Sequence, residues 1–117
     1  SATMLARLAI EAGLPPGVLN VVHGFGPDSV GQFLTEDPRV DRITFTGESG
    51  TGRAISRAAA MNLTPVSLEL GGKGANIVFG DADLDNAVQW AVQAIFRNAG
   101  QVCLAGSRLF VHRSVYD

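Results

Sequence analysis

The chain has 117 residues, of which 46% are hydrophobic and 17% are charged, and its formal net charge is −2. This length suits about one modest domain, and the apolar share excludes a disordered chain. The weakly acidic balance excludes a general attraction for nucleic acid, and no apolar stretch reaches the roughly 18 residues of a membrane span. A single cysteine excludes an intrachain disulfide and indicates a reducing compartment, which we expect to be the cytoplasm.

Patterns typical of helices and of strands alternate along the chain. In chain order they predict a helix marked by Leu5, Leu8, Ala9 and Ala12, a strand over residues 18–22, a short helix from Asp28 or Ser29 through Leu34, a strand over residues 42–46, a helix marked by Ile55, Ala58, Ala59 and Asn62, strands over residues 66–70 and 75–79, a helix from Leu84 to Ile95, and a strand over residues 108–112. Such alternation favours parallel βαβ units over a sandwich. We therefore expect an α/β fold, with a parallel sheet and helices on its faces.

Three of the predicted strand ends run into glycine, at Gly24 and Gly26, at Gly47, and at Gly71 with Gly72. In an open parallel sheet, ligands bind outside the carboxyl ends of the strands, where glycine lets the backbone approach a phosphate. The glycine spacing matches neither the dinucleotide fingerprint nor a P-loop. Two interpretations therefore stay open, a nucleotide site and glycines that simply end strands.

Two side chains stand out as candidates for chemistry. Alternation in the strand over residues 66–70 places Glu69 on the face opposite the apolar residues, just before two glycines. Cys103, the only thiol, lies in a loop of small residues that a substrate can approach, and its thiolate would be a nucleophile. The alternatives are a solvated glutamate or one paired with Lys73, and an ordinary half-buried cysteine.

The sequence gives no support to a metal site. Residues 81–86 resemble the opening of a calcium loop, but Asn86 stands where that loop needs glycine and Val92 where it needs glutamate. The aspartates of this segment are better explained as the cap of the helix that follows. His23 and His112 lack the spacing of a zinc pair, so we expect no metal.

Glu69 and Cys103 lie in motifs that resemble those of the aldehyde dehydrogenase superfamily. Residues 68–73, Leu-Glu-Leu-Gly-Gly-Lys, resemble the glutamate motif of that family, and residues 96–103, Phe-Arg-Asn-Ala-Gly-Gln-Val-Cys, resemble its cysteine motif. Residues 24–27 and 45–48 are similar to two of its cofactor loops, and the resemblance covers essentially the whole chain. Gly74 is a mild departure, since the family more often has Ser, Ala, Asp or Asn at that position.

This resemblance implies a mechanism and a set of site residues. Cys103 would attack an aldehyde, and Glu69 would be the general base that activates water to hydrolyse the resulting thioester. NAD would be the cofactor, favoured over NADP by family habit alone. The implied cofactor-binding residues are Gly26, Pro27, Gly47, Glu48 and Gly52 on the adenine-nucleotide side, and Leu70 and Gly71 near the nicotinamide.

The resemblance also implies a domain organisation. Residues 1–70 would form part of a Rossmann-like NAD-binding domain, and residues 71–117 the N-terminal part of the aldehyde dehydrogenase catalytic domain. The family's oxyanion-hole asparagine and its ribose-binding segment lie outside this sequence. We therefore expect the 117-residue chain to be inactive by itself, and its parent protein to be a homodimer or homotetramer.

Within the superfamily, residues 23–29 and 101–104 are most similar to bacterial semialdehyde dehydrogenases of aromatic catabolism. The substrate expected first is 5-carboxymethyl-2-hydroxymuconic or 2-hydroxymuconic semialdehyde, with betaine aldehyde as the alternative. Two other functional classes stay open, a nucleotide-binding module without chemistry and a cysteine hydrolase or acyltransferase. The hydrolase is the weaker of the two, because no histidine lies near Cys103 or Glu69 in the sequence.

Overall fold

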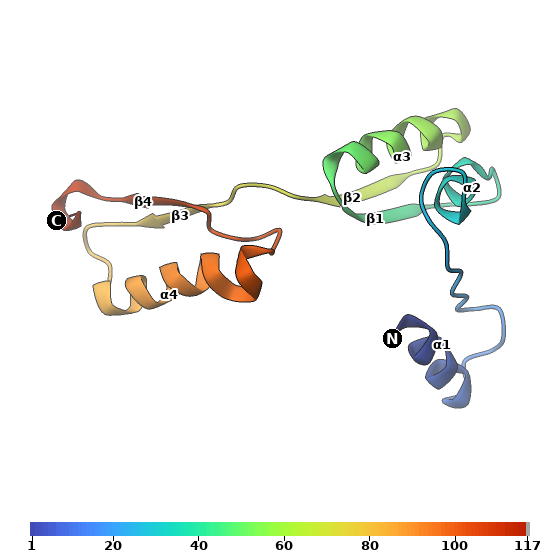
Figure 1. The fold of residues 1–117 in the computed structure, drawn as a ribbon, viewed down its shortest axis with the longest axis horizontal. Coiled ribbons are helices and arrows are strands. Elements are labelled where there is room, and N and C mark those ends of the chain that lie inside the picture. The colour runs from blue at the N-terminus through green and yellow to red at the C-terminus, as the bar shows by residue number, and fades with distance from the viewer. Residues whose placement is uncertain (117) are drawn as a thin grey trace. The chain divides into compact units, whose positions relative to one another are not determined.

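The computed structural model describes residues 1–116 and confirms the α/β fold class (Figure 1). Its elements are α1 (Ala2–Glu11), α2 (Val30–Glu36), β1 (Ile43–Gly47), α3 (Ser49–Asn62), β2 (Val66–Leu70), β3 (Ala75–Val78), α4 (Leu84–Phe96) and β4 (Arg108–Val111), with 3-10 helices at Arg97–Gly100 and Arg113–Val115. In the described part of the chain, β1 pairs with β2 and β3 pairs with β4. The predicted helices all form, and so do the predicted strands except the first.

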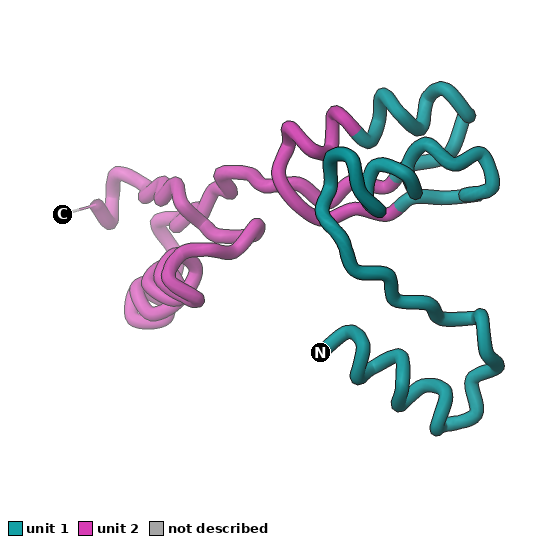
Figure 2. Tube along the Cα trace, turned by 45° about the vertical axis from the view of Figure 1, so that its right-hand side comes forward, with its two compact units in different colours: residues 1–43, 55–66 teal, residues 44–54, 67–117 magenta. Residues whose placement is uncertain are grey.

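The chain divides into two compact units (Figure 2). The first unit comprises residues 1–43 and 55–66, and the second comprises residues 44–54 and 67–117. The division does not follow the order of the sequence, because α3 contributes its first residues to the second unit and its remainder to the first.

The predicted strand over residues 18–22 is wrong. These residues follow a turn in which Gly17 takes a φ of +91°, and they run on as irregular chain. A strand needs a neighbouring strand to take up its backbone N–H and C=O groups, and no described strand pairs with this segment. The side chains of Val18 and Val22 are accordingly exposed.

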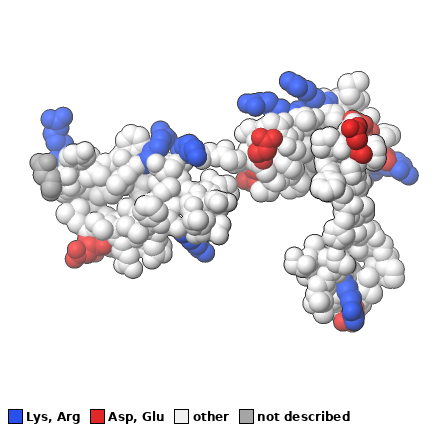
Figure 3. Space-filling view, viewed as in Figure 1, with Lys and Arg blue, Asp and Glu red and all other residues white. Residues whose placement is uncertain are grey.

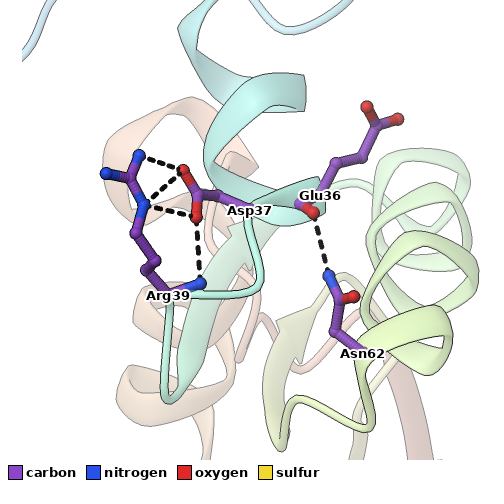
Figure 4. Close-up of polar contacts among 4 residues, drawn as sticks. All are labelled: Glu36, Asp37, Arg39 and Asn62. Atoms are coloured by element: carbon purple, nitrogen blue, oxygen red, sulfur yellow. Dashed lines mark hydrogen bonds and ion pairs between the residues drawn. The ribbon is translucent and has the colours of Figure 1, made fainter.

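Polar contacts join the end of α2 to the end of α3 within the first unit (Figure 4). The side-chain amide of Asn62 donates a hydrogen bond of 2.8 Å to the carbonyl of Glu36, one of the last carbonyls of α2. Such carbonyls have no partner inside their own helix, so Asn62 supplies one. Just beyond, Arg39 forms an ion pair of 2.6 Å with Asp37. This side-chain hydrogen bond from Arg39 lowers the pKa of Asp37 to about 2.

The sheet of β1 and β2 is parallel. The N–H of Ile43 donates to the carbonyl of Pro65 at 3.0 Å, so the two strands start side by side. In the second unit, α3 lies close against one face of β2. A Cβ placed on Gly52 would lie 2.9 Å from Leu70 Cδ2 and 3.6 Å from Leu68 Cδ1. Glycine at this position therefore lets the helix backbone approach the strand.

The sheet of β3 and β4 is also parallel, and its register pairs Ala75 with Arg108. The segment that leads into β4 is held tightly between its neighbours. A Cβ placed on Gly106 would lie 3.1 Å from Asn76 Cβ and 3.3 Å from Ala94 Cβ, and the N–H of Gly106 donates to the carbonyl of Ala94 at 3.1 Å. The chain before β4 is thus fixed against both β3 and α4.

Both ends of α4 are defined by local backbone chemistry. Asp83 caps the start, because its carboxylate accepts a hydrogen bond of 3.2 Å from the N–H of Asn86, as the sequence predicts. Beyond the end of the helix, Asn98, Ala99 and Gly100 take φ values of 51°, 57° and 75°. Successive residues in this left-handed region turn the chain away from the helix axis. The turn leads into the loop that carries Cys103.

Few apolar side chains are buried among residues 1–116. The buried ones are Ile55, Ala59, Val78 and Ala105. Large apolar side chains stay in solvent, and Phe25 and Leu104 are 85% and 86% exposed. Figure 3 shows broad areas of surface without Lys, Arg, Asp or Glu. The chain therefore leaves apolar faces open, although no helix in residues 1–116 is long and apolar enough to cross a bilayer.

Candidate active site

Glu69 lies on β2, one residue before the strand ends. Its side chain is exposed, whereas the flanking Leu68 and Leu70 are half-buried and lie close to Gly52 of α3. Side chains alternate between the two faces of a strand, so Glu69 belongs to the face away from the helix. The sequence pattern predicts this placement. The carboxylate is therefore free to meet water or a ligand.

Cys103 lies in a tight turn after α4. The N–H of Ala105 donates to the carbonyl of Val102 at 3.0 Å, which closes the turn around Cys103 and Leu104. The thiol is exposed in the described part of the chain. Ala105, two residues further on, is buried and anchors the turn.

Hydrogen bonds join the segment that follows Glu69 to the segment that follows Cys103. Arg108 donates from its backbone N–H to the carbonyl of Gly74 at 3.2 Å and from its side-chain Nε to the carbonyl of Lys73 at 3.0 Å. Glu69 and Cys103 thus precede paired parallel strands, each by a short segment. No hydrogen bond between the Glu69 carboxylate and the Cys103 thiol occurs in the described residues. The structure joins the segments that follow Glu69 and Cys103 through one backbone and one side-chain hydrogen bond from Arg108.

Four of the predicted cofactor residues cluster where β1 passes into α3. Gly47 ends β1, Glu48 follows it, and the carbonyl of Glu48 accepts a hydrogen bond of 3.1 Å from the N–H of Gly52, which lies against Leu70. The Glu48 carboxylate also accepts hydrogen bonds from Thr51, at 2.9 Å from its hydroxyl and 2.8 Å from its N–H. These side-chain and backbone hydrogen bonds from Thr51 lower the pKa of Glu48.

The other predicted cofactor residues lie apart from this cluster in the chain. Gly26 and Pro27 belong to the first unit, where the carbonyl of Gly26 accepts a hydrogen bond of 3.0 Å from the N–H of Gln32 at the start of α2. Gly71 belongs to the second unit and has open space around it, with no atom within 4 Å of a Cβ placed there. In residues 1–116, no three His, Cys, Asp or Glu side chains are grouped to hold a metal ion.

A cavity that the sequence did not predict lies beside the Cys103 turn. It has a volume of about 180 Å³, and it is lined by Trp90, Gln93 and Ala94 of α4, by Arg97 directly after that helix, and by Val102, Leu104 and Ala105 of the turn. The first four of these residues recur at the three- and four-residue spacing of one helix face. That spacing is visible in the sequence. What the sequence lacks is the information that the turn folds back over this face.

Comparisons with known proteins point to one family. The sequence profile of the aldehyde dehydrogenase family matches residues 1–117. The chain is 58% identical over 114 residues to a 2-hydroxymuconic semialdehyde dehydrogenase from Pseudomonas sp. (strain CF600), covering 97% of this chain and 24% of that protein. It is 50% identical over 117 residues to a betaine aldehyde dehydrogenase from Vibrio vulnificus, covering 100% of this chain and 24% of that protein.

Solved structures agree with the sequence comparisons. The crystal structure of PnpE in complex with nicotinamide adenine dinucleotide is similar with a TM-score of 0.90 and 50% identity, over 98% of this chain and 23% of that chain. The chain thus spans about a quarter of the length of the relatives that it matches.

The lowered pKa of Glu48 predicts a pH-dependent contribution to stability. Because the pKa is lower in the folded chain, this contribution is present above the pH at which a free glutamate titrates and disappears as the pH falls through the depressed value. We expect Glu48→Gln to lower the free energy of unfolding at neutral pH, measured by urea denaturation, with the difference from wild type shrinking in acid. Asp81→Asn is the matched control, since no described residue donates a hydrogen bond to Asp81. A difference that persists unchanged into acid contradicts the prediction.

Proposed function

Because the chain belongs to the aldehyde dehydrogenase family, we propose that, in a protein of its relatives' length, it oxidises an aldehyde to a carboxylic acid with NAD. The observation that carries this proposal is that Arg108, in the segment that follows Cys103, bonds to Lys73 and Gly74, in the segment that follows Glu69, where β3 and β4 begin to pair. An exposed thiol and an exposed carboxylate on such segments suit acyl transfer. The crystallised complex of PnpE with nicotinamide adenine dinucleotide supports the choice of cofactor.

Cys103 is the proposed nucleophile. Its thiolate attacks the aldehyde carbon, and a carbon–sulfur bond forms as the carbonyl π electrons move to oxygen, giving a thiohemiacetal. The turn from Val102 to Ala105 leaves the thiol exposed, so that an aldehyde can reach it. The Cys103 N–H is proposed to donate a hydrogen bond to the developing oxyanion.

Glu69 is the proposed general base. After the oxidation step a thioester links the acyl group to Cys103, and the Glu69 carboxylate takes a proton from water as that water attacks the thioester carbon. The carbon–sulfur bond then breaks, which releases the carboxylic acid and frees the thiol.

The residues where β1 passes into α3 fit a dinucleotide. Gly47 ends a parallel strand directly before a helix, and Gly52 lets the backbone of that helix lie close to Leu70 of β2, at the carboxyl end of the strand. NAD, when bound, supplies the hydride acceptor. The residues proposed to hold it are Gly26, Pro27, Gly47, Glu48 and Gly52 toward the adenine nucleotide, and Leu70 and Gly71 toward the nicotinamide.

The proposed substrate is a semialdehyde of aromatic catabolism, with 2-hydroxymuconic semialdehyde first. The identity of 58% to an enzyme named for that substrate supports it, and the identity of 50% to a betaine aldehyde dehydrogenase keeps betaine aldehyde as the alternative. We also propose that residues 1–70 belong to an NAD-binding domain and residues 71–117 to a catalytic domain. The parent protein is proposed to be a cytoplasmic homodimer or homotetramer. Assays with both aldehydes, and with NAD and NADP, distinguish these choices.

Replacement of the nucleophile tests the proposal. In the full-length protein, Cys103→Ala should lower the rate of reduced-cofactor formation by on the order of 10⁴-fold or more, because no thiol remains to attack the carbonyl. Binding of NAD, followed by fluorescence, should stay measurable. Ser107→Ala, an exposed change in the same loop, should keep wild-type activity. Equal activity in the two variants would refute the role of Cys103.

Replacement of the base separates the two halves of the reaction. Glu69→Gln should leave the first turnover of reduced cofactor nearly intact and slow later turnovers by on the order of 10²-fold, because hydrolysis of the thioester loses its base. Rapid-mixing absorbance of the reduced cofactor resolves both phases, with Asp41→Asn as a matched control. A wild-type steady-state rate in Glu69→Gln is the result that contradicts this role.

The isolated 117-residue chain should be inactive. Among the described residues few apolar side chains are buried and the Cys103 thiol is exposed, and the chain covers about a quarter of the length of its relatives. With NAD and a semialdehyde, absorbance of the reduced cofactor should not rise above the blank, while the full-length protein turns over under the same conditions. Robust turnover by the isolated chain would overturn this prediction.

A further inference from the structure

Arg108 links the segment that follows Glu69 to the segment that follows Cys103. Arg108 begins β4, and its Nε donates a hydrogen bond of 3.0 Å to the carbonyl of Lys73, a residue 35 positions away in the chain. Its backbone N–H reaches the next carbonyl, that of Gly74, at 3.2 Å. One residue therefore holds two consecutive peptide units of the segment that follows Glu69.

The two bonds differ in what they require of the sequence. The bond to Gly74 is part of the parallel pairing of β3 with β4 and needs only a backbone N–H. The bond to Lys73 needs a long side chain with a rigid, charged donor, which arginine provides. The guanidinium also lies over the ring of Phe110, 5.5 Å from its centroid, which limits its freedom. The side-chain bond is thus not part of the backbone pairing of the strands. It binds the carbonyl of Lys73, the residue directly before Gly74.

The two segments also lie in close contact near Arg108. A Cβ placed on Gly74 would lie 3.1 Å from the carbonyl oxygen of Ala105, the residue that closes the Cys103 turn. The bonds from Arg108 to Lys73 and Gly74 therefore fix where the segment that follows Glu69 lies against the segment that follows Cys103. Hydrolysis of a thioester is sensitive to such shifts, because the base, the water and the thioester carbon must align.

We propose that Arg108 is a positioning residue that sets the Glu69 segment against the Cys103 turn for the hydrolytic half of the reaction. The inference rests on the proposed function of Glu69 and Cys103. Attack by Cys103 on the aldehyde does not use the Glu69 carboxylate, whereas hydrolysis needs that carboxylate at the correct distance from the acyl group. Loss of the Lys73 bond therefore slows hydrolysis more than formation of the thioester.

The test uses Arg108→Gln and Arg108→Lys in the full-length protein with NAD and a semialdehyde. In Arg108→Gln, we expect the first turnover of reduced cofactor to stay within about twofold of wild type and the steady-state rate to fall by about tenfold. Arg108→Lys restores a charged donor and should recover part of the steady-state rate. Arg113→Gln, which removes an exposed arginine of the following 3-10 helix, is the control and should match wild type.

The ratio of the two rates separates positioning from a general loss of structure. A general loss of structure in Arg108→Gln would lower the first turnover and the steady-state rate by the same factor, and that result overturns the proposal. An equal fall of the steady-state rate in Arg108→Gln and in Arg108→Lys also overturns it. Wild-type rates in both phases of Arg108→Gln overturn it as well. Failure of the proposed function looks different, since the wild-type protein itself would then show no turnover with any of the aldehydes tested.

Discussion

The parallel pairing of β3 with β4 fixes which parts of the chain meet around Cys103. Its register places Ala75 beside Arg108, so the segments that lead into the two strands run together. One of them follows Glu69 and the other follows Cys103. The proposed active site depends on that register, because a shift of one residue would move each of these segments relative to the other.

Large apolar side chains around the Cys103 turn stay in solvent. The turn is anchored by buried Ala105, yet Leu104 beside it is 86% exposed. Reactive thiols work in sites that exclude bulk water and hold the substrate still. This exposure, in a chain that spans about a quarter of the length of its relatives, is why we propose that the isolated chain is inactive.

Much of the fold could be predicted from local signals. The strand over residues 66–70 and the helix that Asp83 caps follow from alternation and capping, which neighbouring residues decide. The strand over residues 18–22 fails because a strand depends on a partner, which a local pattern does not reveal. The bond from Arg108 to Lys73 and the cavity against Arg97 also escape prediction, since both depend on tertiary contacts between distant segments. The exposure of Glu69, by contrast, follows from strand alternation alone.

The proposed function requires the Glu69 carboxylate and the Cys103 thiol to serve one site. A crystal structure of the full-length protein with NAD bound tests this requirement most directly. We expect both side chains on the walls of a single cavity beside the nicotinamide ring, with room for a water molecule next to the carboxylate. Side chains that face opposite sides of the intact subunit would contradict it.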